Sequence, residues 1–445
     1  MNANAVRASL ARPIAWIPTL YFAQGLPYVL VMTVSVVMYK RLGVSNTAIA
    51  FVTSWLYLPW VLKPLWSPLI DLRRTRRWWT LVMQAAGAAS LGAIALSLHT
   101  PAYVGLSLAV FSAMALASAT HDIACDGFYM LALPERAQAA YVGLRSTFYR
   151  LAMIAGQGGL VVLAGRWETA TGDIRTAWSM AMTLAAAVFA MLMLYHVRAL
   201  PRPSADIDRS AQRARRADGG SALCDWKHVF ATFFARPQIG RVLAFLLLYR
   251  FAEAQLVKMV TPFLLDGRDS GGLGLSTTEV GIAYGTVGVI ALLLGGILGG
   301  LAGARWGLQR ILWPCVVALH LPDAIFLALA LVQPQQLMVV SAALAVEQFG
   351  YGFGFAAYLL FMLMIASGPY QTAHYAMATG IMALGMMVPG MASGALQEAL
   401  GYPGFFLWVM LSTIPGFIVP ALVRIEPDFG RRQHMPEDGD DGPRP

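Results

Sequence analysis

Residues 67–77 read SPLIDLRRTRR and form a short basic turn between two long apolar stretches, near residues 46–69 and 78–98. Lys and Arg are retained in the cytoplasmic loops of membrane proteins, so this turn marks a cytoplasmic connection between two spans. The composition agrees, because 58% of the 445 residues are hydrophobic and only 12% are charged. Ordinary soluble domains carry about 25% charged residues. The sequence therefore predicts an all-α integral membrane protein.

Twelve apolar stretches are long enough to cross the bilayer, since each span needs about 20 predominantly apolar residues. They lie near residues 14–38, 46–69, 78–98, 102–132, 141–165, 175–197, 239–265, 278–302, 309–331, 335–366, 372–397 and 402–424. One long polar stretch divides them six and six, which suggests an internal duplication. The predicted parts are an N-terminal six-helix bundle, a cytoplasmic linker with an amphipathic helix, a C-terminal six-helix bundle and a disordered cytoplasmic tail, at residues 1–197, 198–238, 239–426 and 427–445.

The distribution of basic residues predicts the orientation. With the N-terminus in the cytoplasm, and with residues at span ends counted in the adjoining loop, the 32 Lys and Arg divide into 22 cytoplasmic, 5 external and 5 within spans. Both termini are therefore expected in the cytoplasm. The net charge of +9 is explained by these short basic loops, so we expect no nucleic-acid partner.

Two aspartates interrupt the fourth stretch, in the sequence SATHDIACD at residues 118–126. Asp122 and Asp126 are four residues apart, so a helix places them on one face. A carboxylate inside a span costs about 2.5–3.5 kcal/mol on insertion scales, so it should face a cavity or a partner. Burial and mutual repulsion disfavour two negative charges there, and we expect one of them to take up and release a proton. Alternatively, the helix ends by Asp122 and both residues are interfacial caps.

Arginines enter the fifth stretch at Arg145 and Arg150. Arginine does not lose its proton in practice, so at this depth it needs an anion. Arg150 is predicted to pair with Asp122 or Asp126 when the protein is empty. Direct contact with an anionic substrate is the alternative, and the sequence does not decide between the two.

The second half carries charges of its own within spans. The motif YRFAE ends at Glu253 and is followed by Lys258, and the motif EQFGYGFG begins at Glu347. We expect Arg250, Glu253, Lys258 and Glu347 to point into the bundle as ligand or proton sites. Arg250 and Glu253 could instead form only a local ion pair. The three glycines after Glu347 let helices approach closely or permit bending.

The turn at residues 67–77 has a counterpart at residues 299–310, which read GGLAGARWGLQR. Both place basic residues in a very short cytoplasmic turn, and both resemble the loop signature of the major facilitator superfamily, Gly-x-x-x-Asp-Arg-x-Gly-x-Arg-Arg. The first copy keeps Asp71, Arg76 and Arg77 but lacks the glycines, and the second lacks the Asp. The resemblance implies two six-helix bundles related by a pseudo-twofold axis, which rock around a central site.

In that superfamily the loop acts as a gate. The resemblance implies that Asp71 pairs with the neighbouring eleventh helix, and that Arg76 and Arg77 steady the state closed towards the cytoplasm. The alternative is that the two arginines only set the topology.

A closer resemblance is to AmpG-type permeases. It rests on GLP at residues 25–27, KPLWSPLID at 63–71, ATHDIACD at 119–126, YRLAM at 149–153, and the two second-half motifs that contain Glu253 and Glu347. AmpG proteins import anhydro-muropeptides, which are sugar-peptide fragments of the cell wall, across the bacterial inner membrane. The wider family includes acetyl-coenzyme A carriers, and similar permeases import siderophores. His121 stands where AmpG commonly has Gln, and Arg250 and Glu253 replace Lys and Asp. The resemblance therefore supports transport as the function more strongly than it supports a particular cargo.

The expected function is proton-coupled import by alternating access in the bacterial inner membrane, by a monomer. The cargo would be a bulky anionic solute whose carboxylates meet Arg150, Arg250 or Lys258, while Asp122, Asp126, Glu253 or Glu347 handles protons. No catalytic residue, metal or cofactor is expected, and the three cysteines show no ligand spacing. Two alternatives are a membrane sensor that docks partners on residues 198–238 or the tail, and a membrane acyltransferase that uses the His-x-x-x-x-Asp spacing of His121 and Asp126.

Overall fold

The computed structural model describes residues 13–207, 222–368, 370–427 and 429–431. Within these ranges the chain forms helices and no strand. The tail predicted at residues 427–445 and the linker segment at residues 208–221 lie almost entirely outside them. Where the four predicted parts begin and end therefore stays a prediction.

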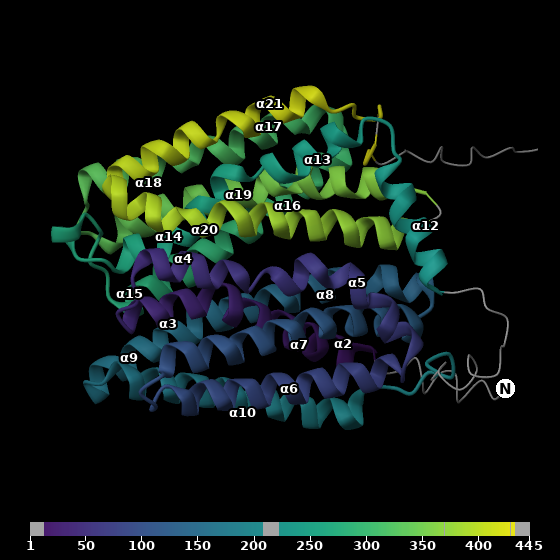
Figure 1. Ribbon diagram of the computed structural model, residues 1–445, viewed down its shortest axis with the longest axis horizontal. Helices are drawn as coiled ribbons and strands as arrows, with labels where there is room; N and C mark the ends of the chain where they lie inside the picture. Colours follow the sequence, from purple (N-terminus) through teal and green to yellow (C-terminus); the bar gives the residue numbers. More distant parts are fainter. Residues whose placement is uncertain (1–12, 208–221, 369, 428, 432–445) are drawn as a thin grey trace, which may run out of the picture.

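The first six spans form one bundle, seen in purple to blue in the lower half of Figure 1. Short π-helical turns interrupt the first and fifth spans. In chain order the spans are α2 (Pro13–Val29), η1 (Leu30–Val34) and α3 (Ser35–Arg41); α4 (Asn46–Trp55) and α5 (Leu58–Leu72); α6 (Arg76–Ser97); α7 (Tyr103–Ala132); α8 (Glu135–Met153), η2 (Ile154–Leu160) and α9 (Val161–Thr171); and α10 (Ile174–Ala199).

The second six spans form the other bundle, in green to yellow above the first (Figure 1). They are α13 (Ile239–Leu248) and α14 (Phe251–Leu265); α15 (Thr277–Val280), η4 (Gly281–Gly288) and α16 (Val289–Trp306); α17 (Leu308–His320), η5 (Leu321–Asp323) and α18 (Ala324–Val332); α19 (Leu337–Ala366); and α20 (Gln371–Ser412) with α21 (Ile414–Leu422), which together make the last two spans. A turn of 3-10 helix, η3 (Arg268–Ser270), lies between the seventh and eighth spans, and the linker contributes α12 (Ala222–Phe234).

Ten helices in the described ranges are each long and apolar enough to cross a membrane. The seventh span is not among them because it breaks at Tyr249 and Arg250 into two shorter helices. The eleventh and twelfth spans run together across a kink at Gly401, where φ is 67° and ψ is 172°. All twelve predicted spans are accounted for, and the predicted fold class is confirmed. Because α7 continues to Ala132, the alternative that the fourth span ends by Asp122 is wrong.

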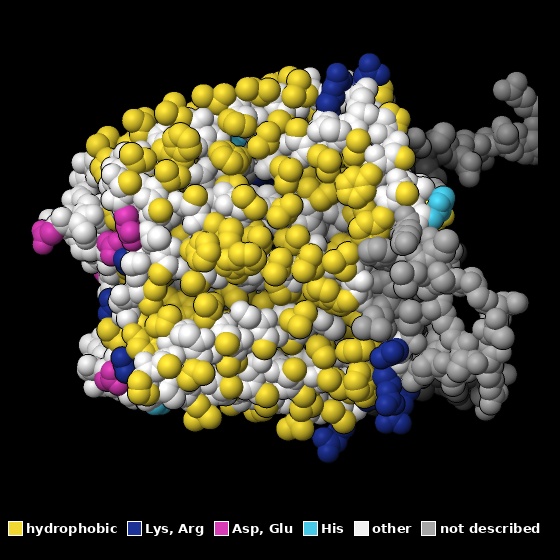
Figure 2. All heavy atoms as spheres, viewed as in Figure 1, with side chains coloured by type: hydrophobic (Ala, Val, Ile, Leu, Met, Phe, Trp, Pro, Cys, Tyr) yellow, Lys and Arg dark blue, Asp and Glu magenta, His cyan; other side chains and the backbone are white. Residues whose placement is uncertain are grey.

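The molecule has two ends, which we name by their connections. The linker end carries α12 and the start of α2, and the far end carries the turns after α3, α9, α14 and α18 (Figure 1). Figure 2 shows hydrophobic side chains covering the flank between the ends, with carboxylates gathered at the far end and most of the visible Lys and Arg at the linker end. This distribution matches a protein whose flank lies in lipid.

Close helix packing in the C-terminal bundle depends on glycines. A Cβ atom on Gly295 of α16 would lie 2.0 Å from the carbonyl oxygen of Phe349 in α19, and one on Gly350 of α19 would lie 2.2 Å from that of Ala318 in α17. Real side chains never approach so closely, so only glycine fits while the helix backbones are in contact. The glycines that follow Glu347 therefore serve close packing.

A matched pair of substitutions in α16 tests this packing. Gly295→Ala is expected to lower the free energy of unfolding by about 1–3 kcal/mol, the usual cost of overpacking, because the new methyl group must push α19 away. Gly300→Ala is the control, since no atom lies within 4 Å of the position its Cβ would take. Thermal unfolding of the two purified variants in detergent measures the difference, and equal unfolding curves would contradict the packing argument.

Candidate functional site

Asp122 of α7 lies beside aromatic and basic side chains of α5. The indole Nε1 of Trp60 donates a hydrogen bond of 3.1 Å to Asp122 Oδ2, and Lys63 Nζ lies 3.8 Å from the same oxygen. Asp122 Oδ1 is buried and has no hydrogen-bond partner among the described residues. One carboxylate oxygen is therefore held by the protein while the other is available to a proton or a ligand.

Asp126, one turn further along α7, is paired with Arg145 of α8. Arg145 Nη2 donates to Asp126 Oδ1 at 2.9 Å, and longer hydrogen bonds of 3.4 Å come from Tyr21 and Gln24. The guanidinium also lies over the ring of Tyr21, 4.5 Å from its centroid. About a third of each side chain of the ion pair is exposed, 36% for Asp126 and 32% for Arg145, so water and solutes can reach it.

The predicted pairing of Arg150 with these aspartates is wrong, at least among the residues described. Five residues separate Arg150 from Arg145, which places it about 140° further round the helix, away from α7. Its Nη2 atom instead approaches α16 of the other bundle, 3.5 Å from where a Cβ on Gly296 would lie. Arg150 therefore faces the junction between the bundles, and the alternative role, contact with a substrate anion, stays a prediction.

His121 belongs to a buried chain of hydrogen bonds and not to a pair with Asp126. Its Nε2 lies 3.0 Å from the side-chain amide of Gln84, which also bonds His196, and His196 in turn bonds Thr19. These contacts tie α2, α6, α7 and α10 together inside one bundle. His121 is 3% exposed, so its role in this arrangement is structural.

Arg250 sits at the break between α13 and α14, with φ −115° and ψ 24°. Its Nη2 donates a hydrogen bond to the hydroxyl of Tyr351, and its guanidinium lies 4.8 Å from the ring centroid of Phe355. Arg250 Nε and Glu253 Oε2 are both buried without hydrogen-bond partners among the described residues. The alternative of a simple local ion pair between Arg250 and Glu253 therefore does not describe the arrangement.

Lys258 of α14 joins the two bundles. Its Nζ donates to Thr53 Oγ1 at 2.9 Å and lies 5.1 Å from the ring centroid of Tyr57. Both partners belong to the second span of the N-terminal bundle. Since Lys258 is 2% exposed, a cation is held between the bundles by one hydroxyl and one aromatic face.

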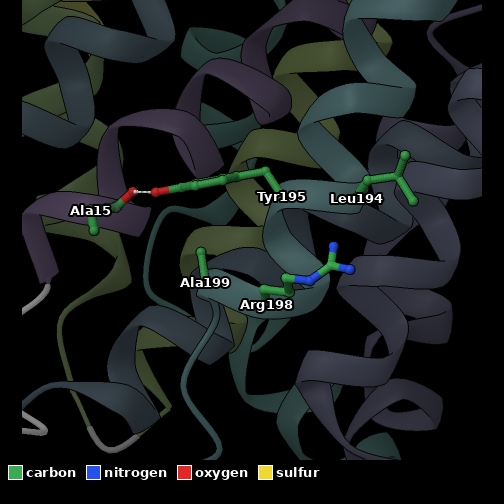
Figure 3. Close-up of a pocket in the computed structure, with 5 residues that line it drawn as sticks. All are labelled: Ala15, Leu194, Tyr195, Arg198 and Ala199. Atoms are coloured by element: carbon green, nitrogen blue, oxygen red, sulfur yellow. Dashed lines mark hydrogen bonds between the residues drawn. The ribbon is translucent and has the colours of Figure 1, made fainter.

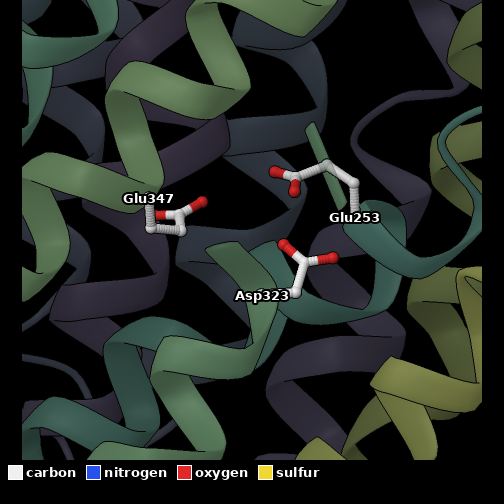
Figure 4. Close-up of side chains that lie close together, drawn as sticks. All are labelled: Glu253, Asp323 and Glu347. Carbon is white, nitrogen blue, oxygen red and sulfur yellow. The ribbon is translucent and has the colours of Figure 1, made fainter. Parts of the chain in front are cut away.

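Glu253, Asp323 and Glu347 meet inside the C-terminal bundle. One carboxylate oxygen from each lies within 4.8 Å of the other two, and Figure 4 shows the three side chains converging from α14, η5 and α19. All three are buried, at 2%, 1% and 2% exposure. Two of the three were predicted from the sequence, and Asp323 was missed. The same signal, an acid within an apolar span, was present in the LPD sequence at residues 321–323.

The far end of the molecule is sealed by polar contacts between the bundles. Asn46 Nδ2 of α4 donates to Gln397 Oε1, Tyr402 Oη and Asp266 Oδ2 at 2.6, 3.1 and 3.2 Å, and Lys40 forms an ion pair of 2.6 Å with Asp266. Further contacts join Thr47 to Glu398 and Thr277 to Glu168. These contacts come from helices of both bundles and hold the far end closed.

The proposed gating loop has a different set of contacts. The backbone N–H groups of Arg76 and Arg77 donate to the carboxylate of Asp206 in the linker at 2.7 and 3.0 Å, and the Arg77 guanidinium bonds the Leu200 carbonyl at 3.3 Å. The side chain of Asp71 lies outside the described residues. Asp206 therefore caps α6 and fastens the linker to it, and a gate role for the three residues stays a prediction.

A surface pocket of about 420 Å³ lies elsewhere, between the start of α2 and the end of α10. It is lined by Ala15, Leu194, Tyr195, Arg198 and Ala199, and Figure 3 shows the Tyr195 hydroxyl bonded to the Ala15 carbonyl across it, at 2.7 Å. None of the charged residues described above lines this pocket. The charged residues within the spans, described above, are therefore the better candidate site.

Residues 19–394 match the family model of the Major Facilitator Superfamily. The chain belongs to this superfamily. It is a secondary transporter and not an enzyme, so the membrane acyltransferase alternative is wrong. The bundle arrangement, the broken seventh span and the charged residues between the bundles are the features that this membership leads one to expect.

Several named relatives cover most of the chain. The anhydromuropeptide permease of Escherichia coli strain K12 is 25% identical over 423 residues, which is 92% of this chain and 79% of that protein. An uncharacterized protein of Haemophilus influenzae is 27% identical, with 89% of this chain and 91% of that protein covered. Putative transporter AmpG 4 of Rickettsia felis is 23% identical, with 89% and 92% covered. The predicted resemblance to AmpG-type permeases is confirmed as a distant relationship.

Solved structures agree on the fold. A D-xylose-proton symporter superimposes with a TM-score of 0.69 at 12% identity, covering 96% of this chain and 98% of that one. The nucleoside transporter NupG superimposes with a TM-score of 0.64 at 18% identity, covering 92% and 99%. At such identities the likeness extends to the fold alone.

Proposed function

We propose that this transporter imports a bulky anionic sugar-peptide of the anhydro-muropeptide class across the bacterial inner membrane, and that a proton gradient drives the import. The observation that carries the proposal is the set of cationic side chains that both bundles contribute near their junction. Arg145 and Arg150 come from α8, and Arg250 and Lys258 come from the seventh span. Such charges inside spans need anions, and Arg150 and Lys258 have no acidic partner among the described residues.

The contacts between the bundles support alternating access. The far end is closed by the Asn46 and Lys40 contacts. The excess of basic residues near the linker end favours a cytoplasmic location for that end. With this orientation, the arrangement is that of a carrier closed to the outside, from which cargo would leave towards the cytoplasm.

The acids supply candidate proton sites. Asp126 is ion-paired with Arg145 and partly exposed, so a proton that reaches Asp126 would free the guanidinium for an anionic cargo. Asp122, Glu253 and Glu347 are further candidates because each has a carboxylate in a largely buried position. Proton uptake and cargo binding would then be linked through the same cations.

Membrane vesicles test the cargo and the driving force together. Right-side-out vesicles from cells that make the protein should accumulate labelled anhydro-muropeptide above the level of vesicles without it, and an uncoupler should abolish the accumulation. A ferric siderophore and acetyl-coenzyme A serve as competing cargo classes. Accumulation of either of these and not of the muropeptide would overturn the proposed cargo, and uptake that is unchanged by the uncoupler would overturn the coupling.

A further inference from the structure

We propose that Glu253, Asp323 and Glu347 form a binding site for a hard metal cation inside the C-terminal bundle. Their three oxygens lie within 4.8 Å of one another. Some point therefore lies within about 2.8 Å of all three oxygens, and calcium–oxygen distances in proteins are about 2.3–2.6 Å. Carboxylate oxygens are also the ligands that hard cations prefer. The spacing and the donor set therefore suit a hard cation.

The protein itself does not neutralise this cluster. Glu253 Oε2 and both oxygens of Asp323 are buried and receive no hydrogen bond from the described residues, and Glu347 Oε2 receives one, from Gln348 at 3.0 Å. Arg250 is the nearby cation, and its guanidinium is directed to Tyr351. Three buried carboxylates that meet in this way carry negative charge that is costly to bury unless a positive species binds.

His320 is an independent indication of a ligand at this position. It is 1% exposed, neither ring nitrogen has a hydrogen-bond partner among the described residues, and Nδ1 lies 3.9 Å from Asp323 Oδ2. Carboxylates that bind a metal are in turn hydrogen-bonded by outer groups, and this buried imidazole lies beside Asp323 with its donor capacity unused by the described residues. His320 does not belong to the triangle of oxygens, so we assign it to positioning Asp323.

Two helix breaks meet at the same place. The seventh span is interrupted at Arg250, three residues before Glu253, and the ninth is interrupted by η5, which ends at Asp323. In transporters, interrupted helices are where coupling ions bind, because freed backbone groups and side chains converge there. Gly350 adds to this convergence, since it lets α17 approach α19 and so brings η5 next to Glu347.

Binding of the ion alone tests the proposal, without any cargo. Purified protein in detergent is titrated with radiolabelled Na⁺ and, separately, with Ca²⁺. One of the two ions is expected to bind at about one per chain, and Asp323→Asn and Glu347→Gln should each weaken its binding at least about tenfold, the effect of losing about 1.4 kcal/mol. Asp269→Asn, which changes an exposed acid in the far-end turn, should bind as the wild type does.

Thermal unfolding provides the second measurement. The ion that binds should raise the unfolding temperature of the wild type and leave that of Asp323→Asn unchanged, and Glu347→Gln replaces that variant if it does not fold. The proposal is overturned if neither ion binds to the wild type, because the acids then hold protons. It is also overturned if Asp323→Asn and Glu347→Gln both bind the ion as tightly as the wild type. Because no cargo is present, a wrong cargo assignment would not affect either result.

Discussion

Arg250→Ala is expected to reduce the initial rate of cargo uptake by at least about 30-fold. Truncating one member of a buried charged cluster costs about 2–5 kcal/mol, since the groups left behind lose their counter-charge. In this protein Arg250 is 7% exposed, its guanidinium lies over Phe355 and bonds Tyr351, and it comes three residues before the buried Glu253. Removal would take away both the proposed cargo-binding cation and the charge that faces Glu253.

Two further variants separate the role of Arg250 from a general loss of folding. Arg250→Lys keeps the charge but not the planar fork that stacks on aromatic rings, so its uptake should lie between the wild type and Arg250→Ala. Arg241→Ala removes an exposed arginine from the same span and should transport normally. Uptake is measured in vesicles with the amount of folded protein determined for each variant. A rate for Arg250→Ala within threefold of the wild type would exclude the assigned role.

The fold was largely predictable because lipid imposes a simple rule on sequence. Each span must form its backbone hydrogen bonds within the helix and present apolar side chains to the bilayer. Long apolar stretches and basic turns such as residues 67–77 are therefore enough to predict the number and order of the spans. The break at Arg250 was not predictable from hydropathy, because it depends on local packing and leaves the apolar pattern unchanged.

The candidate site was predictable as a set of residues but not as a set of partners. Charges within spans identified Asp122, Asp126, Glu253 and Glu347, yet sequence order does not give the angular position at which two helices meet. Arg145 and not Arg150 therefore pairs with Asp126. The prediction of the three buried acids was incomplete because Glu253, Asp323 and Glu347 come from helices that are far apart in the sequence. Asp323 is brought next to the other two only by the close approach of α17 to α19.

The far-end seal was not predicted for a different reason. Asn46, Gln397 and Tyr402 are ordinary polar residues near span ends, where polar side chains are common and carry no special cost. Only their convergence across the two bundles gives them a role. The sequence identifies residues whose burial costs free energy. The structure is needed to find ordinary polar residues whose role comes from the hydrogen bonds that they form between the bundles.

Asp126→Asn is expected to abolish proton-driven accumulation of cargo while exchange of cargo across the membrane continues. Asparagine resembles a permanently protonated aspartate, so it cannot accept and release a proton, and it leaves Arg145 without its ion-pair partner at 2.9 Å. Arg145 would then remain available to an anionic cargo, and a carrier that still binds cargo can exchange it without net proton movement. The internal level of labelled cargo should fall at least about tenfold, to near the external level.

Counterflow distinguishes this uncoupled state from an inactive protein. Vesicles loaded with unlabelled cargo and diluted into labelled cargo should take up label through Asp126→Asn, although the same vesicles show no accumulation when an inward proton gradient is imposed. Asp269→Asn, in an exposed turn, should accumulate cargo as the wild type does. Continued accumulation by Asp126→Asn would move the proton site to Asp122 or to the acids of the C-terminal bundle. Loss of both accumulation and counterflow would mean that the Asp126–Arg145 pair is needed for cargo binding or for the movement of the bundles, and not for coupling alone.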